Sequence, residues 1–283
     1  MSPNLFVLGF PKAGTTTLAK GLGGHEEIFL PSVKEPLYWC QPEFQRFGHE
    51  PIWDSCTHYE GLYVSGANCR YRLDASTRYV FSRHAIERIL QEYGETGRFI
   101  LMVRDPAQMV VSYHSELRKT FAVEHDRFAD EWRQQELRRP SSRAIDYRWV
   151  GKVADHVSRV EAIVPSEQLL VLPLTLLASS TAEFAERISS FLDIDIAPAV
   201  FSIARNPSSV ARFSMLRRCA LTPPRVLEES MLAIRGVYSR LPERLRNSMY
   251  RKDAPDLVDE ATLLDVNSYF SDQFQMLSAR GLV

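Results

Sequence analysis

The sequence predicts an α/β fold in which a parallel sheet is flanked by helices, with helical additions toward the C-terminus. Three short apolar runs carry this prediction, and turns or amphipathic segments follow them: residues 5–9, 99–103 and 169–174. Strands that alternate with helices imply parallel crossovers, which place helices against the faces of one sheet. We expect a single domain over residues 1–283, because the chain contains no obvious linker, internal repeat or low-complexity tract.

Each predicted strand is followed by a turn or by a segment with a helical pattern. Residues 5–9 lead into a turn of glycine, proline and threonine and then into a helix around residues 18–20. The run 99–103 meets Arg-Asp-Pro, and the amphipathic stretch 107–119 predicts a helix with proline near its start. The run 169–174 precedes a helical pattern over residues 181–192.

The remaining segments are predicted to be helical. Residues 121–149 are polar and rich in arginine, and they indicate helix. From residue 225 to the C-terminus the pattern favours two or three further helices.

Composition and charge exclude several classes of protein. Of 283 residues, 45% are hydrophobic and 24% are charged, which gives a sizeable core and excludes disorder and fibres. The formal net charge of −1 gives no global field for nucleic acid or an anionic membrane, so any anion site must be local. The four cysteines have neither metal-ligand nor CxxC spacing, and no apolar run approaches the length of a membrane span. We therefore expect a soluble cytoplasmic protein with reduced thiols.

The first turn has the features of an anion-binding loop. Residues 9–18, Gly-Phe-Pro-Lys-Ala-Gly-Thr-Thr-Thr-Leu, lie between the first predicted strand and helix, where backbone N–H groups point at a ligand. Lys12 adds a full charge and the threonines add hydroxyl donors. The loop is P-loop-like, but Thr15 follows Gly14 where GxxxxGK[ST] has its lysine. This departure argues against an ordinary nucleotide triphosphatase, and a plain capped turn remains the structural alternative.

A second anion site is predicted after the second apolar strand. Arg104 follows that strand directly, and Ser112 lies eight positions later, about two helical turns on. Ligands of open parallel sheets bind at the carboxyl ends of the strands, so both sites are expected at one sheet edge. Two such sites suit a ligand with two separated anionic groups. The alternative is an Arg104 paired with a carboxylate and a Ser112 on the helix surface.

These residues resemble a known family, the sulfotransferases that use 3′-phosphoadenosine 5′-phosphosulfate (PAPS), especially the heparan-sulfate type and its bacterial relatives. The resemblance covers most of the chain. Residues 10–18 resemble the family's 5′-phosphosulfate loop, and Arg104 with Ser112 resembles its 3′-phosphate motif. Residues 25–39 resemble its "HP.I.LP..KEPHFF" stretch, which places Glu35 where the family has its catalytic glutamate.

Three later segments also resemble the family. Residues 74–79 resemble "E.SP.Y", with Thr77 in place of the proline and Ala75 where some animal members have lysine. Residues 206–212 resemble "N.S..PR" near the nucleotide, with Ala211 replacing the proline, and residues 263–277 resemble the terminal helix. The resemblance thus implies catalytic roles for Lys12 and Glu35. The resemblance and the anion-binding loop together imply a set of donor-binding residues, which are Lys12, Ala13, Gly14, Thr15, Thr16, Thr17, Arg104, Ser112 and Arg212.

The resemblance implies sulfuryl transfer from PAPS to an acceptor hydroxyl by in-line displacement, with a carbohydrate or a small natural product as the expected acceptor. Such a transfer needs an aligned acceptor, a base and a stabilised leaving group. Lys12 is expected to stabilise the departing phosphate and Glu35 to be the general base. The family transfers without a metal, and the transferred group carries less charge than a γ-phosphoryl group.

Other interpretations stay open at this stage. A P-loop kinase or another nucleotide phosphotransferase would need magnesium ligands, and Asp74 is a poor candidate. A nucleotide-binding module without catalysis is a further alternative. His114 is the next candidate base, whereas His156 and Arg159 are expected on a solvated helical face. Aromatic residues suited either to acceptor stacking or to core packing are Tyr38, Trp39, Phe44, Phe47, Trp53, Tyr59 and Tyr63.

Overall fold

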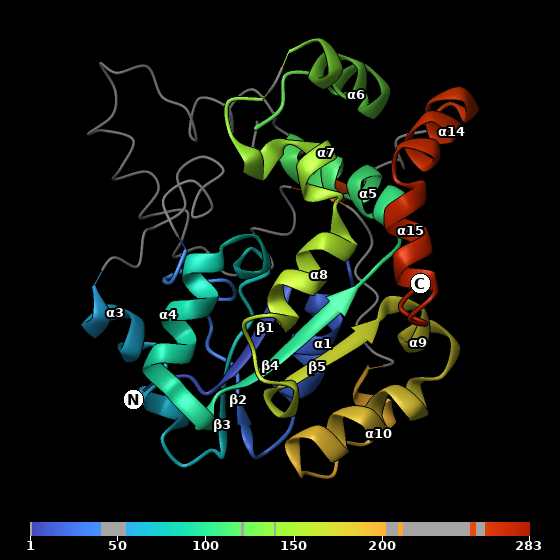
Figure 1. Ribbon diagram of the computed structural model, residues 1–283. Coiled ribbons are helices and arrows are strands. Elements are labelled where there is room, and N and C mark those ends of the chain that lie inside the picture. Colours follow the sequence, from blue (N-terminus) through green and yellow to red (C-terminus); the bar gives the residue numbers. More distant parts are fainter. Residues whose placement is uncertain are drawn as a thin grey trace, which may run out of the picture.

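A parallel sheet forms the centre of the protein (Figure 1). The computed structural model describes residues 2–40, 55–119, 122–138, 140–201, 209–211, 250–252 and 258–283. Within these residues the sheet has five parallel strands in the order β2-β3-β1-β4-β5. Their bounds are β1 Leu5–Gly9, β2 Ile28–Phe29, β3 Tyr71–Asp74, β4 Arg98–Val103 and β5 Leu169–Pro173. A separate antiparallel pair joins β6 (Ser209–Ala211) to β7 (Tyr250–Lys252).

Helices cover the sheet, with α8 in front of it and α1 behind it in the view of Figure 1. The described α-helices are α1 Thr15–Leu22, α3 Cys56–Gly61, α4 Arg83–Tyr93, α5 Pro106–Lys119, α6 Phe128–Leu137, α7 Tyr147–Val150, α8 Val153–Glu161, α9 Leu174–Ser179, α10 Thr181–Leu192, α14 Glu260–Tyr269 and α15 Ser271–Ser278. Short 3₁₀ helices join them: η1 Val64–Gly66, η2 Tyr79–Phe81, η3 Gly94–Thr96, η4 Arg143–Ile145, η5 Ser166–Gln168 and η6 Pro198–Phe201.

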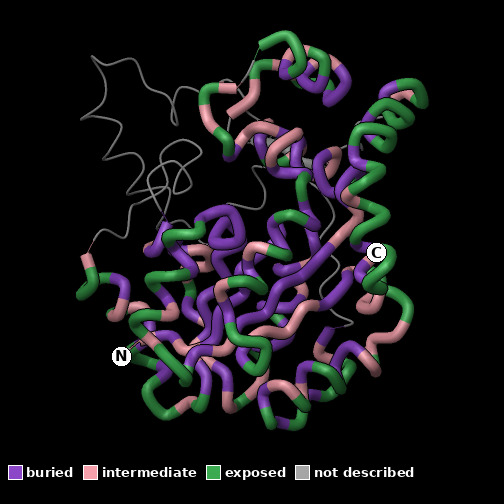
Figure 2. The backbone as a smooth tube through the Cα atoms, viewed as in Figure 1, coloured by how far each residue is buried: buried purple, intermediate pink, exposed green. Residues whose placement is uncertain are grey.

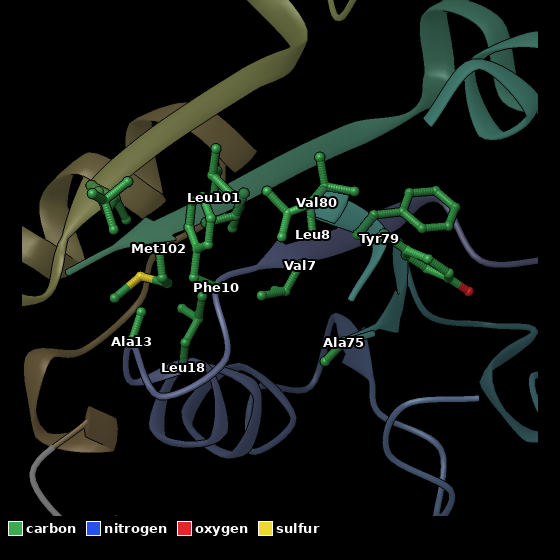
Figure 3. Close-up of a cluster of buried hydrophobic side chains, with 14 of the residues drawn as sticks. Val7, Leu8, Phe10, Ala13, Leu18, Ala75, Tyr79, Val80, Leu101 and Met102 are labelled. Atoms are coloured by element: carbon green, nitrogen blue, oxygen red, sulfur yellow. The ribbon is translucent and has the colours of Figure 1, made fainter. Parts of the chain in front are cut away.

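The core lies on both faces of the two central strands. All of β1 is buried, as is β4 beyond its first residue, and Figure 2 shows the buried centre. Strands buried on both faces read as continuous apolar runs, which explains why these two were visible in the sequence. In Figure 3, Val7 and Leu8 point to opposite faces, with Leu18 of α1 below and Val80 above. Burying each large apolar side chain stabilises the fold by about 1.5–3 kcal/mol.

Several predicted boundaries are confirmed, with local physical causes. The predicted helix 181–192 is α10, and Ser180 caps it by accepting the Glu183 N–H at 3.2 Å. The helix predicted from residue 107 begins at Pro106, because Asp105 accepts the Gln108 N–H at 2.8 Å. The predicted strand 169–174 ends one residue earlier, at Pro173.

Other expectations were too broad. Residues 121–149 are not continuously helical, since α6, η4 and the start of α7 are separated by extended segments. The terminal helix expected over 263–277 is two helices, α14 and α15, separated at Phe270. The sequence reading did not identify β2 and β3 as strands, because β2 has two residues and an arginine interrupts β3.

The last helix, α15, packs on α8, and α14 packs on α5. Gln273 Nε2 donates to Asp155 Oδ1 at 2.9 Å, and the Asp155 N–H donates back to Gln273 Oε1 at 3.2 Å. A Cβ at Gly151 would lie 2.2 Å from the Phe270 ring, so glycine permits this approach. These contacts favour the predicted single domain, which remains a prediction.

None of the helices in the described ranges combines the length and the apolar character that crossing a bilayer requires.

Candidate functional site

One pocket of about 440 Å³ lies at the carboxyl ends of β1 and β4. Its walls come from the loop after β1, the first turn of α1, the turn around residue 35, and α5. The predicted residues that line it are Lys12, Gly14, Thr15, Thr16, Thr17, Glu35, Arg104 and Ser112. Both predicted anion sites and both predicted catalytic groups therefore face one space.

The loop after β1 is shaped by two glycines. A Cβ at Gly9 would lie 2.6 Å from Val80 Cγ1 and 2.9 Å from the Thr77 carbonyl oxygen. Gly14 has φ +83° and precedes α1, and a Cβ there would meet Leu174 Cδ1 at 2.7 Å. Since only glycine has no Cβ, these positions let the chain turn tightly against its neighbours.

The start of α1 faces the pocket with Thr15, Thr16 and Thr17. The first N–H groups of a helix have no intrahelical acceptor, and the helix dipole favours an anion beside them. No side-chain hydrogen bond from Gly14 caps this end. Ala13 departs from the prediction, because its N–H donates to the Phe10 carbonyl at 3.2 Å and its side chain is buried in the core.

Lys12 projects its ammonium toward α5. Nζ lies 3.6 Å from Glu116 Oε2, and the side chain is 22% exposed, whereas that of Glu116 is 50% exposed. The backbone of Lys12 is left-handed, with φ +63°, a conformation that costs a non-glycine residue roughly 1–3 kcal/mol. The Lys12 carbonyl accepts Nη1–H of Arg104 at 2.9 Å, and this bond helps to hold the residue in place.

Arg104 has a buried N–H donor without a partner among the described residues. Nη1 holds the Lys12 carbonyl and Nη2 lies 3.4 Å from Gln108 Oε1, whereas Nε is buried without a partner among the described residues. Burial lowers the pKa of Arg104, and the neighbouring Asp105 carboxylate opposes this shift. The guanidinium stays charged because its ordinary pKa is far above neutrality. A partly buried guanidinium at a pocket wall, with its Nε unpaired among the described residues, fits an anionic ligand.

One face of α5 supplies the wall beside Arg104. Ser112 and Glu116 are four residues apart on this helix, and both line the pocket. Residues at this spacing project from the same side of a helix. The pocket therefore has a hydroxyl donor on the same helix face as Glu116, and the Glu116 carboxylate lies beside Lys12.

The Glu35 carboxylate is held from two sides. Lys34 Nζ donates to Oε1 at 2.5 Å, and Thr77 Oγ1 donates to Oε2 at 3.1 Å. Burial alone would raise the pKa of Glu35, but the Lys34 and Arg78 charges and the two hydrogen bonds outweigh it and lower that pKa. Glu35 is thus ionised at neutral pH and can accept a proton.

The turn that carries Glu35 rests on a buried carboxylate that was not predicted as a site residue. Asp74, at the end of β3, is fully buried and accepts hydrogen bonds from the hydroxyls of Tyr59, Tyr79 and Ser76. The signal was present in the sequence as an acid followed by serine and tyrosine at a strand end. The sequence placed Asp74 in the segment that resembles "E.SP.Y" and made it a poor metal ligand, but it did not show the contact with Tyr59, which is 15 residues away.

The structure corrects the prediction for His156 and places His114 away from the pocket. His156 is buried, not solvated, and Nε2 lies 3.0 Å from the Trp149 carbonyl. Burial and the Arg159 charge lower the pKa of His156 to about 3. His114 is also buried, between the Tyr147 hydroxyl and the Asp126 carbonyl, and it does not line the pocket. Arg159 packs inward and donates to the Val80 carbonyl at 2.6 Å.

The remaining predicted residues are either outside the described part of the chain or buried in the core. Arg212 and the aromatic residues Phe44, Phe47 and Trp53 fall outside the described residues. Trp39, Tyr59 and Tyr63 are buried in the core, and Tyr38 stacks on Tyr59 with ring centroids 4.3 Å apart. For these described aromatics, core packing is the better explanation.

Comparison of the fold with solved structures finds bacterial sulfotransferases. A sulfotransferase from Alicyclobacillus acidocaldarius aligns with a TM-score of 0.62 at 24% identity, over 73% of this chain and 87% of that one. The sulfotransferase domain of the curacin biosynthetic pathway aligns at 0.48 and 15% identity, over 71% and 77% of the two chains. The sulfotransferase domain of the Synechococcus PCC 7002 olefin synthase aligns with a TM-score of 0.46 at 15% identity, over 95% of each chain.

The sequence itself matches one family. No curated protein matches the chain. The family description "sulfotransferase domain" matches residues 2–219, which include the pocket residues and most of the sheet and its helices. This family is one of transferases, and the predicted fold class is confirmed by the five-stranded parallel sheet within the described residues. The chain therefore belongs to the sulfotransferase domain family.

Proposed function

We propose that this protein transfers a sulfuryl group from PAPS to an acceptor hydroxyl, on a carbohydrate or a small natural product. One observation carries the proposal. Lys12, Glu35, the start of α1 and the pair Arg104 and Ser112 all line a single pocket. A donor with a 5′-phosphosulfate and a 3′-phosphate requires this combination of two anion sites and two catalytic groups.

The residues present fit the two ends of such a donor. The N-terminal turn of α1 and Lys12 suit the 5′-phosphosulfate, because helix N–H groups and an ammonium both favour negative charge. Arg104 and Ser112 suit the 3′-phosphate, because Arg104 has a buried Nε without a partner among the described residues and Ser112 adds a hydroxyl. Arg212 stays a candidate on sequence resemblance alone.

Lys12 and Glu35 supply the chemistry on the protein side. When bound, the donor supplies a sulfuryl group whose bond to the 5′-phosphate oxygen breaks as the acceptor oxygen bonds to sulfur. Glu35, ionised and held by Lys34 and Thr77, accepts the proton of the acceptor hydroxyl. Lys12 stabilises the negative charge that develops on the leaving phosphate. A preorganised charge of this kind is among the larger single contributions to catalysis.

The ion pair of Lys12 with Glu116 must then give way. In the structure the ammonium lies 3.6 Å from a half-exposed carboxylate. A more negative ligand at the start of α1 competes with this carboxylate for Lys12. Because exposed pairs are worth only about 0–1 kcal/mol, the exchange costs little.

Isothermal titration calorimetry tests the donor assignment. We expect the product adenosine 3′,5′-bisphosphate to bind without added metal, and more tightly than ATP with or without magnesium. Tighter binding of magnesium-ATP would instead support a nucleotide phosphotransferase. An acceptor screen with PAPS in EDTA then separates an enzyme from a binding module, because bisphosphate binding without turnover on any acceptor would contradict transferase function.

A further inference from the structure

Three hydroxyl groups connect the Asp74 carboxylate to the turn of residues 35–39. Ser76 Oγ donates to Asp74 Oδ1 at 2.6 Å and accepts the Leu37 N–H at 3.1 Å. Tyr59 OH donates to Asp74 Oδ2 at 2.7 Å and accepts the Trp39 indole N–H at 3.1 Å. The third is Tyr79 OH, which donates to Oδ2 at 2.9 Å and lies 3.5 Å from the Trp39 N–H.

The direction of these bonds depends on the charge of Asp74. An ionised carboxylate only accepts hydrogen bonds, so each hydroxyl must give its single proton to it. Each hydroxyl oxygen is then left with lone pairs for an N–H group of the turn. A neutral side chain at this position donates to at least one of the hydroxyls, and that hydroxyl can no longer point its proton at residue 74. The carboxylate therefore orients all three contacts in the same direction.

The turn held in this way has an unusual backbone. Glu35 has φ +65° and Leu37 has φ +55°, conformations that L-residues adopt only when the surroundings require them. The segment that follows Asp74 also reaches the carboxylate of Glu35 directly, through Thr77 Oγ1. The same short segment thus fixes both the backbone and the side chain of the proposed base.

We propose that Asp74 is a positioning residue, whose ionised carboxylate orients Ser76, Tyr59 and Tyr79 so that they hold the turn 35–39 and keep Glu35 at the pocket. This inference rests on the proposed role of Glu35 as the general base. Asp74 does not line the pocket, so it acts only through the turn.

Titration of the surrounding groups makes the inference testable by pH. Burial raises the pKa of Asp74 to about 6, and the Glu35 charge adds to this, while the three hydroxyl hydrogen bonds oppose it. The titratable groups that interact electrostatically with Asp74 include Glu35, Cys40, Tyr59, Tyr63, Tyr79 and Tyr93. Burial raises the pKa of the thiol and of the phenols further above neutrality, and the pKa of Glu35 is lowered. Of this group, Asp74 alone is expected to titrate near pH 6.

The chain offers a matched pair of variants. Tyr59 and Tyr63 are both buried, but only the Tyr59 hydroxyl bonds both to Asp74 and to the turn, at Trp39. Tyr59→Phe and Tyr63→Phe remove the same atom from neighbouring rings, and only the first breaks a contact to Asp74 and Trp39. We expect Tyr59→Phe to lower kcat by about tenfold and Tyr63→Phe to leave it near the wild-type value. Equal effects would overturn the inference.

Asp74→Asn and Ser76→Ala test the same contacts at their centre. We expect kcat for Asp74→Asn to fall between about 10-fold and the 10²-fold that a displacement on the order of 1 Å can cost. The KM for the donor and the affinity for adenosine 3′,5′-bisphosphate should not change. Between pH 5 and 7 the kcat of the wild type should fall toward low pH with an apparent pKa near 6. The Asn variant should lack this fall, and an unchanged acidic limb would contradict the role of Asp74.

Amide hydrogen exchange provides a readout without turnover. In Ser76→Ala the Leu37 N–H loses its acceptor, so we expect it to exchange at least tenfold faster while amides in β4 keep their rates. Unchanged exchange at Leu37 would refute the proposed contact even if Asp74→Asn does not fold. Glu35→Gln is measured in parallel. If it keeps full activity, the proposed base is wrong; if it loses activity while Tyr59→Phe and Tyr63→Phe behave alike, only the positioning role is wrong.

Discussion

The two walls of the pocket are built in different ways. The first wall consists of the loop after β1, the first turn of α1, Arg104 and one face of α5, and its two cationic residues, Lys12 and Arg104, lie within a few residues of a strand end. The opposite wall carries Glu35 on a turn with two left-handed residues, which is held by groups about 20–40 positions away along the chain. The charged groups of the first wall can therefore be recognised from local sequence, although the bond from Arg104 to the Lys12 carbonyl also holds its loop in place, whereas Glu35 in the second wall cannot.

This difference explains what could be predicted. Lys12 and Arg104 were identified from their positions after apolar strands, since a buried parallel strand and its capped helix leave a local pattern. Glu35 was identified by resemblance, because nothing in its own neighbours distinguishes it from an exposed loop carboxylate.

The failures have the same origin. Asp74 gains its partners from α3 and η2, and His156 is buried by Phe10, Phe81 and Trp149 from separate elements. Helical period alone cannot reveal which polar side chain a neighbouring element will cover. The Ala13 N–H was assigned to the ligand because the loop was treated as a uniform cradle, yet it closes a turn to Phe10.

The largest expected effect is at the wall that carries Glu35. Glu35→Gln should lower kcat by about 10²–10⁴-fold, the range that a positioned base contributes, with little change in affinity for adenosine 3′,5′-bisphosphate. Steady-state kinetics and calorimetry check the two quantities. Wild-type kcat in the variant would remove Glu35 from the reaction.

The second-largest effect is expected at the first wall, which holds Lys12. Lys12→Ala removes the charge beside the leaving group, and we expect kcat to fall at least about 10²–10³-fold while part of the donor affinity remains. Lys20→Ala, at the last turn of α1 and outside the pocket, is the matched control. Full activity of the Lys12 variant would show that the two walls do not share the chemistry.

Arg104→Ala separates the two ends of the donor. Loss of charged hydrogen bonds worth about 1.5–3 kcal/mol predicts roughly 10–100-fold weaker binding of adenosine 3′,5′-bisphosphate. AMP, which lacks the 3′-phosphate, should lose much less. Arg98→Ala, at the other end of β4, controls for general destabilisation. Equal losses for both nucleotides would argue against a 3′-phosphate site at Arg104.

The buried Asp74 carboxylate, which supports the turn that carries Glu35, is also expected to lower the stability of the fold near neutral pH. Because the pKa of Asp74 is raised from 3.8 to about 6 in the fold, its contribution to stability is full below about pH 3.8 and is lost as pH rises through 6. Two pKa units correspond to at most about 3 kcal/mol. In thermal unfolding, the Tm of Asp74→Asn minus the Tm of the wild type should therefore rise by several degrees between about pH 4 and pH 7.5. Parallel pH dependences of Tm would rule out this penalty.

The smallest effect concerns the pair of Lys12 with Glu116. Glu116→Gln frees the ammonium from a half-exposed carboxylate, so adenosine 3′,5′-bisphosphate should bind up to about fivefold tighter at low salt. Glu87→Gln changes the charge equally on α4, where Glu87 pairs with Arg83. If both variants shift the affinity alike, the pair with Lys12 has no specific effect.

A crystal structure with adenosine 3′,5′-bisphosphate tests the shared pocket most directly. We expect the 5′-phosphate at the N-terminal turn of α1, within hydrogen-bond distance of Lys12, and the 3′-phosphate on Arg104 and Ser112. A nucleotide bound with its 3′-phosphate away from Arg104, or bound outside this pocket, would contradict it.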